Sequence, residues 1–382
     1  MREMSDDDAD DVESTSVYRC NVTKHNGEGP HWDGRTNTLL FIDMGQGDVH
    51  RLNYITGEDD IKHFEDPVGF VVPRKSGGYI VGHGKKVSHF DWDSGAVSTL
   101  AEVEQGLLTQ FNDAKCDASG RLWAGTTAKE VDGIREPERG SLYSLSKDQK
   151  ITKHVDKISI SNGVDWTDDN RTMYYIDSTP RQVWAYDFDI SIGSMSNKRT
   201  VVDFGGAETM DTLGVPDGMT IDNNGHIWVA CYGVGKVICF DPETGKRLKT
   251  LEFPSAKKTT SCCFGGPNMD ELFVTSGTYN LTPEQRRTVS KSATHSVKVS
   301  DAQCQSQRRT VSKSATHSVK VSDAQCQSQR RIVSKSATHS VKVSDAQCQK
   351  MSRFPLNQLH KPDYYALDTI PIQENVGSKY GD

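Results

Sequence analysis

The amino-acid sequence predicts an all-β fold, a six-bladed β-propeller. Between about Val17 and Gly277 the chain repeats one kind of unit six times, at a spacing of roughly 40 to 55 residues. In each unit, two runs of alternating apolar residues flank a turn rich in Gly, Asn and Asp, which is the pattern of a β-hairpin. Units of this length that contain two or three strands are typical of propeller blades.

The hairpins follow one another in order along the chain. Their sequences are GPHWDGRTNTLLFID (29–43), VVPRKSGGYIVG (71–82), AKCDASGRLWAG (114–125), SNGVDWTDDNRTMYYID (161–177), MTIDNNGHIWVA (219–230) and CFGGPNMDELFVT (263–275). The unit at 161–177 shows the pattern most clearly, because an Asn-Gly corner and a short strand precede a polar turn and a strongly β-prone run. A third strand often follows, as in GKVICFDPETGKRL at 235–248.

The segments outside these units have a different composition. Residues 1–16 hold seven acidic residues and one Arg, so we expect a disordered acidic tail. The propeller is expected to span residues 17–285. Residues 286–349 repeat RR(T/I)VSKSATHSVKVSDAQCQ three times at a period of 22, and this Ser-, Lys- and Gln-rich composition favours disorder. Residues 350–382 form a C-terminal tail whose structure the sequence does not indicate.

Composition bounds the cellular setting and the partners. The sequence shows neither a signal peptide nor an apolar run long enough to span a membrane, so we expect a cytoplasmic protein without a membrane partner. Nine cysteines without a CxxC pair favour reduced thiols over a disulfide framework. The acidic tail carries −6 and the repeats together +9, so the total of −7 leaves about −10 on residues 17–285. An acidic propeller repels phosphate backbones, so nucleic acid is not an expected partner.

Aligning the six hairpins places one residue of each unit at the entrance to an inner strand. These residues are Glu28, Val68, Asn112, Asn162, Asp217 and Thr260. We expect their side chains to form a ring at one mouth of the central channel. Val68 should form part of the wall of the channel rather than provide a ligand. Four of the six are carboxylates or amides, and converging oxygen donors suit Ca²⁺, Mg²⁺ or Mn²⁺, with Zn²⁺ less favoured. The alternative is that Asn162-Gly163 and Asp217-Gly218 are only turn formers.

Several long stretches of the sequence are similar to one protein family. They are GEGPHWD, FNDAKCDASGRLWAGTT, SNGVDWTDDNRTMYYIDS, VPDGMTIDNNGHIWVACYGVGKVICFDPETGKRLKT and KTTSCCFGGPNMDELFVTS. With them the chain resembles the family of regucalcin (senescence marker protein), gluconolactonases and luciferin-regenerating enzymes. The resemblance implies a six-bladed propeller in which Glu28, Asn162 and Asp217 hold one divalent cation, Zn²⁺, Ca²⁺, Mn²⁺ or Mg²⁺.

The resemblance also implies a substrate site beside the metal. It assigns hydrogen bonds with a sugar lactone to Asn112, Asp113 and Glu130. Family members usually carry Arg where this chain has Gln110, so one charged substrate contact is replaced by a neutral amide.

The resemblance ends after Gly277. Family members follow the sixth hairpin with a strand that completes the last blade, and nothing at 350–382 matches that strand. The sequence therefore leaves open an incomplete last blade with an exposed sheet edge, in which Thr260 is not held in the ring.

Together with these residues, the resemblance implies a divalent-metal-dependent hydrolase of sugar lactones, a gluconolactonase-type carboxylic ester hydrolase. A divalent cation lowers the pKa of water and polarises a carbonyl oxygen, and a nearby carboxylate can accept the proton. We assign that catalytic role to Asp217, charge neutralisation to Glu28 and a neutral third ligand to Asn162. The sequence shows no GxSxG motif and no Ser-His-Asp arrangement, which disfavours a covalent acyl-enzyme.

Two other functions stay open on the sequence. One is a non-catalytic Ca²⁺-binding regulatory protein with a role in calcium homeostasis, which Gln110 and the missing terminal strand favour. The other keeps the pocket but uses a thiazoline-like or organophosphate-type substrate. Propellers host binding and catalysis alike, so the fold cannot choose among them. The expected partners are a small-molecule sugar lactone and a divalent metal ion.

Overall fold

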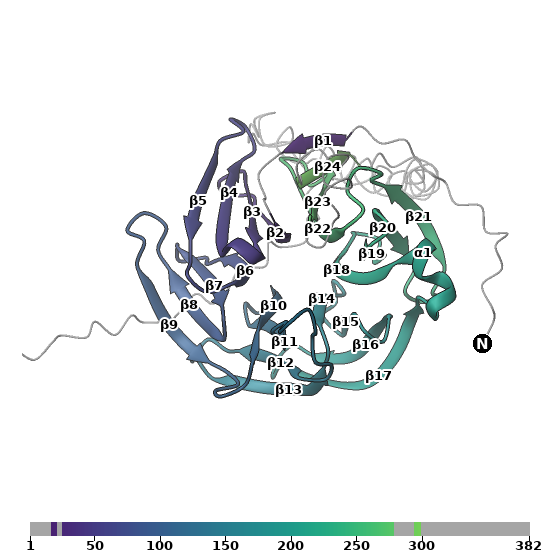
Figure 1. Ribbon diagram of the computed structural model, residues 1–382, viewed down its shortest axis with the longest axis horizontal. Helices are drawn as coiled ribbons and strands as arrows, with labels where there is room; N and C mark the ends of the chain where they lie inside the picture. The colour runs from purple at the N-terminus through teal and green to yellow at the C-terminus, as the bar shows by residue number, and fades with distance from the viewer. Residues whose placement is uncertain (1–16, 21–24, 279–293, 299–382) are drawn as a thin grey trace, which may run out of the picture. The chain divides into compact units, whose positions relative to one another are not determined.

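The described part of the chain is an all-β propeller. The computed structural model describes residues 17–20, 25–278 and 294–298. Six four-stranded sheets make up most of these residues, and in Figure 1 the sheets are arranged around a common centre. The predicted tails at 1–16 and 350–382, and the repeats apart from 294–298, lie outside the described residues.

The first three sheets follow one another along the chain, each with its strands paired in sequence order. The first contains β2 (Gly27–Asp33), β3 (Thr38–Asp43), β4 (Asp48–Asn53) and β5 (Asp59–His63). The second contains β6 (Val68–Pro73), β7 (Tyr79–His83), β8 (Lys86–Phe90) and β9 (Val97–Glu102). The third contains β10 (Thr109–Cys116), β11 (Leu122–Ala128), β12 (Gly140–Leu145) and β13 (Ile151–Ile158).

The next two sheets repeat this plan, and the sixth departs from it. The fourth contains β14 (Ser161–Trp166), β15 (Thr172–Asp177), β16 (Gln182–Asp189) and β17 (Ser194–Asp203). The fifth contains β18 (Val215–Ile221), β19 (Ile227–Tyr232), β20 (Lys236–Phe240) and β21 (Arg247–Glu252). The sixth has the order β22 (Thr259–Gly265), β23 (Glu271–Ser276), β24 (Thr294–Lys298) and β1 (Val17–Cys20).

Helices are short in the part of the chain that the structure describes. They are η1 (Met44–Gln46), η2 (Ala207–Thr209) and α1 (Met210–Leu213). None of the described helices has the length and apolar character needed to cross a membrane.

The inner strands of successive sheets contact one another around the centre. Strand β2 contacts β6, β6 contacts β10, β10 contacts β14, β14 contacts β18, and β18 contacts β22. Strand β22 in turn contacts β2, so the inner strands form a closed circle. Residues near the start of each inner strand therefore face a shared axis.

Hydrophobic cores lie between the faces of neighbouring sheets. Phe70 and Val72 of β6, for example, pack in one cluster with Phe111, Cys116 and Leu122 of the next sheet. The second strand of the first sheet, β3, has both of its faces covered in this way, and all six of its residues are buried. A sheet covered on both faces needs apolar residues on both, which explains the continuous apolar runs in the sequence.

The sixth sheet brings the two ends of the described chain together. Strand β24 pairs with β23 on one side and with β1 on the other. Thr294–Lys298 lies inside the repeat region, so the prediction of disorder over 286–349 is wrong for these five residues. The sequence HSVKVS alternates valine with polar residues, and this period-two pattern suits a strand that pairs with an open sheet edge. The missing fourth strand is supplied by β1 rather than by residues 350–382.

The sixth sheet also packs firmly against the first. The rings of Trp32 and Phe273 stack with centroids 5.5 Å apart, and the Tyr54 hydroxyl donates a hydrogen bond to Glu271. Thr260 is fully buried, and its hydroxyl donates to the carbonyl of Gly27 at 2.5 Å. The expectation that Thr260 is not held in the ring is therefore wrong.

We expect β1 to contribute to the stability of the whole propeller, because it covers the edge of β24. Deleting residues 1–20 removes this strand, whereas deleting residues 1–16 leaves it in place and serves as the matched control. The longer deletion should lower the melting temperature by roughly 5 °C or more, since 1 kcal/mol corresponds to about 2–4 °C in a domain of this size. Equal melting temperatures of the two deletions in a thermal unfolding scan would show that β1 is dispensable.

Candidate functional site

Each of the six inner strands has an irregularity at the position that the sequence alignment selected. The register of pairing shifts between Glu28 and His31, Val68 and Phe70, Phe111 and Ala114, Ser161 and Val164, Pro216 and Met219, and Thr259 and Ser261. A β-bulge at such a point re-aims the side chain that follows it. The aligned residues, which we call the ring, thus share a backbone feature as well as a sequence position.

Three acidic side chains of the ring region influence one another electrostatically. Burial raises the pKa of the Glu28 carboxyl well above its usual range, and the charges of Asp217 and Asp113 raise it further. The pKa of Asp217 is raised well above its usual range by burial and then by the charge of Asp113. Burial raises the pKa of Asp113 to about 6. The three carboxylates are therefore close enough to oppose one another's ionisation.

One oxygen of Asp217 has no hydrogen-bond partner in the described part of the chain. The side chain is 8% exposed, and its Oδ1 atom is buried without a donor. Leaving a buried polar atom unsatisfied costs about 1–3 kcal/mol, and more when the group is charged. Buried orphan atoms of this kind call for an explanation such as an ion.

The amide of Asn162 is fixed by hydrogen bonds on both sides. Its Nδ2 group donates to Ser178 Oγ at 2.7 Å, and its Oδ1 atom accepts from Asn112 Nδ2 at 2.7 Å. Because a carbonyl oxygen has two lone pairs, one lone pair of Oδ1 remains for a further partner. Ser178 Oγ also donates to the carbonyl of Pro216 at 2.7 Å, which ties Asn162 to the strand that carries Asp217. Sequence reasoning missed Ser178, although it directly follows the fourth hairpin.

The remaining two ring residues supply no charge to the site. Val68 is fully buried in the core between the first two sheets, as expected for a residue that offers no ligand atom. Thr260 directs its hydroxyl to the backbone next to Glu28 and to Thr275 Oγ1 at 2.9 Å. The polar side chains therefore lie on the arc formed by β10, β14 and β18, and on β2, which β6 and β22 separate from that arc.

The two other predicted substrate residues lie at the edge of this arc. Gln110 is half-buried on β10, two residues before Asn112, and its Nε2 atom lies 3.8 Å from the sulfur of Met44. Glu130 is exposed in the loop that leaves β11, and its carboxylate lies 3.9 Å from the guanidinium of Arg135. Thr127, near the start of that loop, pairs with Gln110. The loop therefore begins beside the ring.

The central channel is nearly filled below the ring. A cavity of about 30 Å³ there is lined by inner-strand residues that include Gly29, Asp113 and Met219. At roughly 10–15 Å³ per water, it holds no more than two or three waters. Lys115, which lines the same cavity, donates to Asp165 Oδ2 at 2.7 Å, and this buried ion pair joins the third and fourth sheets. The cavity is therefore too small for a ligand larger than a few waters, so a sugar cannot pass through the channel at this level.

The donor set fits a hard divalent cation. Glu28 and Asp217 offer carboxylate oxygens, Asn162 offers an amide oxygen, and Mg²⁺, Mn²⁺ and Ca²⁺ favour such ligands. A dication among these side chains would offset the repulsion that raises the carboxyl pKa values, and it would give the orphan Asp217 Oδ1 a partner. The residues present therefore satisfy the chemical requirements of the predicted metal.

The chain is similar to known proteins over the propeller region. Residues 26–278 match the family described as SMP-30/Gluconolactonase/LRE-like region. Regucalcin of Xenopus laevis is 44% identical over 252 residues, which cover 65% of this chain and 82% of the relative. A luciferin-regenerating enzyme has a similar structure, with a TM-score of 0.68 and 32% identity over 74% of this chain and 95% of its own.

A calcium-binding protein, regucalcin of Agrobacterium tumefaciens, is also similar in structure. Its TM-score is 0.67 at 25% identity, over 72% of this chain and 92% of its own. The match at residues 26–278 ends before the repeats, where the sequence resemblance was also found to end. The chain belongs to the SMP-30/gluconolactonase/LRE-like family.

Proposed function

We propose that this protein is a divalent-metal-dependent hydrolase of sugar lactones. The observation that carries the proposal is the buried, unpartnered Oδ1 atom of Asp217 beside two other carboxylates that raise each other's pKa. Family membership supports it, because the family includes gluconolactonases. We also infer that the six sheets act as six blades, each of which brings one ring residue to the axis.

The three proposed metal ligands have different tasks. When bound, a divalent ion would lower the pKa of a water molecule and polarise the carbonyl oxygen of the lactone. Glu28 neutralises charge, and Asn162 gives a neutral oxygen whose direction is fixed by Asn112 and Ser178. We assign to Asp217 the acceptance of the proton of the attacking water, because a carboxylate that contacts both an ion and its water can take that proton. The water oxygen would bond to the lactone carbonyl carbon, the C–O bond of the lactone ring would break, and the leaving ring oxygen would take the proton from Asp217 to give the open hydroxy acid.

We assign the substrate contacts to residues of the third sheet and its loop. Asp113, whose pKa burial raises to about 6, would accept hydrogen bonds from sugar hydroxyl groups near neutral pH. Asn112 holds Asn162 and lines the same mouth. We assign Glu130 to the loop that covers the bound sugar, and Gln110 to a neutral hydrogen bond at its edge.

The setting that we propose is the cytoplasm. Five cysteines of the propeller are buried free thiols, Cys116, Cys231, Cys239, Cys262 and Cys263, and such thiols are typical of a reducing compartment. The proposed partners are the lactone and the ion, and the net charge of −7 argues against nucleic acid.

Hydrolysis of D-glucono-δ-lactone tests the proposal. The full chain is treated with a chelator, and Zn²⁺, Mn²⁺, Mg²⁺ or Ca²⁺ is then restored one at a time. We expect at least one ion to restore hydrolysis well above the spontaneous rate. Chelated protein that retains full activity, or protein that binds an ion without restored hydrolysis of this or other small lactones, would contradict the proposal.

A non-catalytic calcium-binding role is the second candidate. It is favoured by Gln110, which rests against Met44 and carries no charge toward a substrate. The calcium-binding regucalcin of Agrobacterium tumefaciens shows that this fold can hold calcium. Ion binding without turnover would favour this role over the lactonase.

Gln110→Arg tests whether this position contacts the lactone. A charged hydrogen bond is worth about 1 kcal/mol more than a neutral one, so the variant should lower the KM for the lactone roughly five- to tenfold with little change in kcat. Gln110→Met keeps the side-chain length without a donor and is the matched control, in which KM should rise. If KM is the same in all three proteins, then this position does not contact the substrate.

A further inference from the structure

Three side chains with metal-binding atoms converge at a place outside the ring. They are Asp222, which follows β18, His226, which precedes β19, and Cys239 on β20. One ligand atom from each lies within 4.8 Å of the others. Cys239 pairs with Trp228 across the sheet, so the thiol sits directly over the turn that carries the other two donors. We call these three residues the turn cluster.

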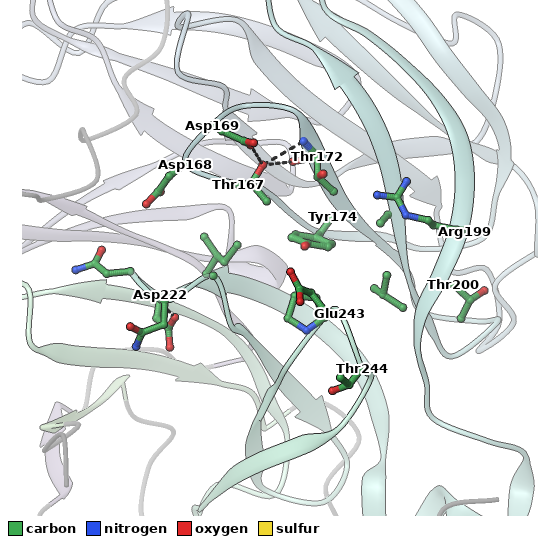
Figure 2. Close-up of a pocket in the computed structure, with 17 residues that line it drawn as sticks. Thr167, Asp168, Asp169, Thr172, Tyr174, Arg199, Thr200, Asp222, Glu243 and Thr244 are labelled. Atoms are coloured by element: carbon green, nitrogen blue, oxygen red, sulfur yellow. Dashed lines mark hydrogen bonds between the residues drawn. The ribbon is translucent and has the colours of Figure 1, made fainter. Parts of the chain in front are cut away.

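The turn cluster lies at the opposite ends of the strands from the ring. Asp217 is near the start of β18, whereas Asp222 directly follows the end of that strand. Asp222 lines a groove of about 770 Å³ between the fourth and fifth sheets, together with Asn224, Tyr174 and Glu243. Figure 2 shows the Asp222 carboxylate on the wall of this groove. A hydrated ion can therefore reach the cluster from solvent without passing the ring.

The third sheet contains the same turn with different side chains. There Asp117 accepts hydrogen bonds from the backbone of Ser119 and Arg121 and from the indole of Trp123, at 3.1 Å for the last. Asp222 accepts the same set from Asn224, His226 and Trp228, again at 3.1 Å for the indole. The two turns therefore share one backbone scaffold, and their Asp–Trp hydrogen bonds are structural in both.

Two of the differences between these turns concern metal-binding atoms. Arg121 forms an ion pair with Asp117 at 2.8 Å, and His226 stands at the corresponding place with its Nδ1 atom 3.3 Å from Asp222 Oδ2. Ser144 pairs with Trp123, and Cys239 pairs with Trp228 at the corresponding place. The fifth sheet therefore replaces a guanidinium and a hydroxyl by an imidazole and a thiol, which are metal donors.

We propose that Asp222, His226 and Cys239 bind a borderline transition-metal ion, of which Zn²⁺ and Co²⁺ are the best-matched examples. Thiolate and imidazole ligands select such ions over Ca²⁺ and Mg²⁺, which prefer oxygen. Three protein ligands leave one tetrahedral position for water. The ring offers only oxygen donors, so the two sites should differ in the ions that they prefer.

The surroundings of the cluster suit a cation. Burial, followed by the negative charges of Asp222 and Asp241, raises the pKa of the Cys239 thiol. A hydrogen bond from the Thr244 hydroxyl is the main cause that lowers the pKa of Asp241, and the charge of His226 lowers it further, so a second carboxylate lies near the same centre. A bound dication deprotonates a coordinating thiol, and here it would also neutralise the acidic pair. Metal binding at the cluster should therefore release a proton.

Titration of the full chain with Co²⁺ in the presence of excess Ca²⁺ tests this inference. A thiolate-to-cobalt charge-transfer band in the near ultraviolet reports sulfur ligation, which the oxygen donors of the ring cannot give. Two variants use residues that the third sheet carries at the same places: Cys239→Ser matches Ser144, and His226→Arg matches Arg121. Cys231→Ser, which changes a buried thiol on β19 of the same sheet, is the matched control.

We expect the band in the wild type and in Cys231→Ser, its loss in Cys239→Ser, and at least a tenfold weaker affinity for Co²⁺ in His226→Arg. Excess Zn²⁺ should abolish the wild-type band by competition. Circular dichroism establishes that each variant is folded, and either variant alone is sufficient for the test if the other fails to fold. Absence of the band from wild-type protein, or a band of equal strength in Cys239→Ser, would overturn the inference.

Discussion

Asp217→Asn should abolish both metal binding at the ring and lactone hydrolysis. The change keeps the size of the side chain but removes a negative ligand and the proposed general base. General-base catalysis contributes about 10²–10⁴-fold, so kcat should fall by at least that factor even at saturating metal. Calorimetric titration with the activating ion and a lactone hydrolysis assay measure the two effects on the same preparation.

The same variant should be more stable than the wild type after chelation. Without the ion, the buried carboxylates of Glu28, Asp113 and Asp217 oppose one another, and Asn removes one of these charges. A merely damaged fold would lower the melting temperature instead. Asp211→Asn, an exposed change of the same chemistry on α1, is the control and should leave binding, turnover and stability unchanged. Normal turnover in Asp217→Asn would remove Asp217 from the mechanism.

The metal-free protein should lose stability as the pH rises from about 4 to beyond 6. The folded-state pKa values of Glu28, Asp113 and Asp217 are raised, to about 6 for Asp113. Between the unfolded value of about 4 and the raised value, the folded state binds more protons than the unfolded state, so raising the pH favours unfolding. Asp113 alone corresponds to about 3 kcal/mol at 1.36 kcal/mol per pKa unit. Urea unfolding of chelated protein at several pH values measures this slope.

A bound ion should cancel or reverse that pH dependence. Ligand carboxylates must be ionised to bind a cation, so ion affinity should increase over the same pH range and binding should release protons. Asp217→Asn without metal should show a shallower loss of stability than the wild type. A chelated wild type whose stability is flat between pH 4 and pH 7 would mean that the three carboxylates do not interact as described.

The repeated hairpins were sufficient to predict the all-β propeller and the family. Alternation of apolar residues and Gly-, Asn- and Asp-rich turns is local information, and the structure confirms a strand on each side of the turns at 34–37 and 167–171. Alignment of one residue per hairpin also found the ring, because a bulge recurs at the same place in every inner strand. The roles of the ring residues stay predictions.

Features that depend on contacts between distant residues were not predictable in this way. The pairing of β1 with β24 joins segments at the two ends of the described chain, and composition alone favoured disorder for the second of them. Ser178 links Asn162 to the strand of Asp217 only because the fourth and fifth sheets are neighbours, which lets its hydroxyl reach the carbonyl of Pro216. The turn cluster was missed because Cys239 lies 13 residues from His226 in the sequence, and only strand pairing brings the two together.

Simultaneous measurement of bound ion and activity tests the central claim most directly. Chelated protein is titrated with the activating ion, and the bound fraction and the rate of D-glucono-δ-lactone hydrolysis are determined at every point. We predict that the rate rises in proportion to occupancy of the ring by the ion and stops rising when the ring is full. The Asp217→Asn variant should show neither ion binding at the ring nor hydrolysis. Hydrolysis that does not follow occupancy, or full occupancy without hydrolysis, would contradict a metal-dependent lactonase.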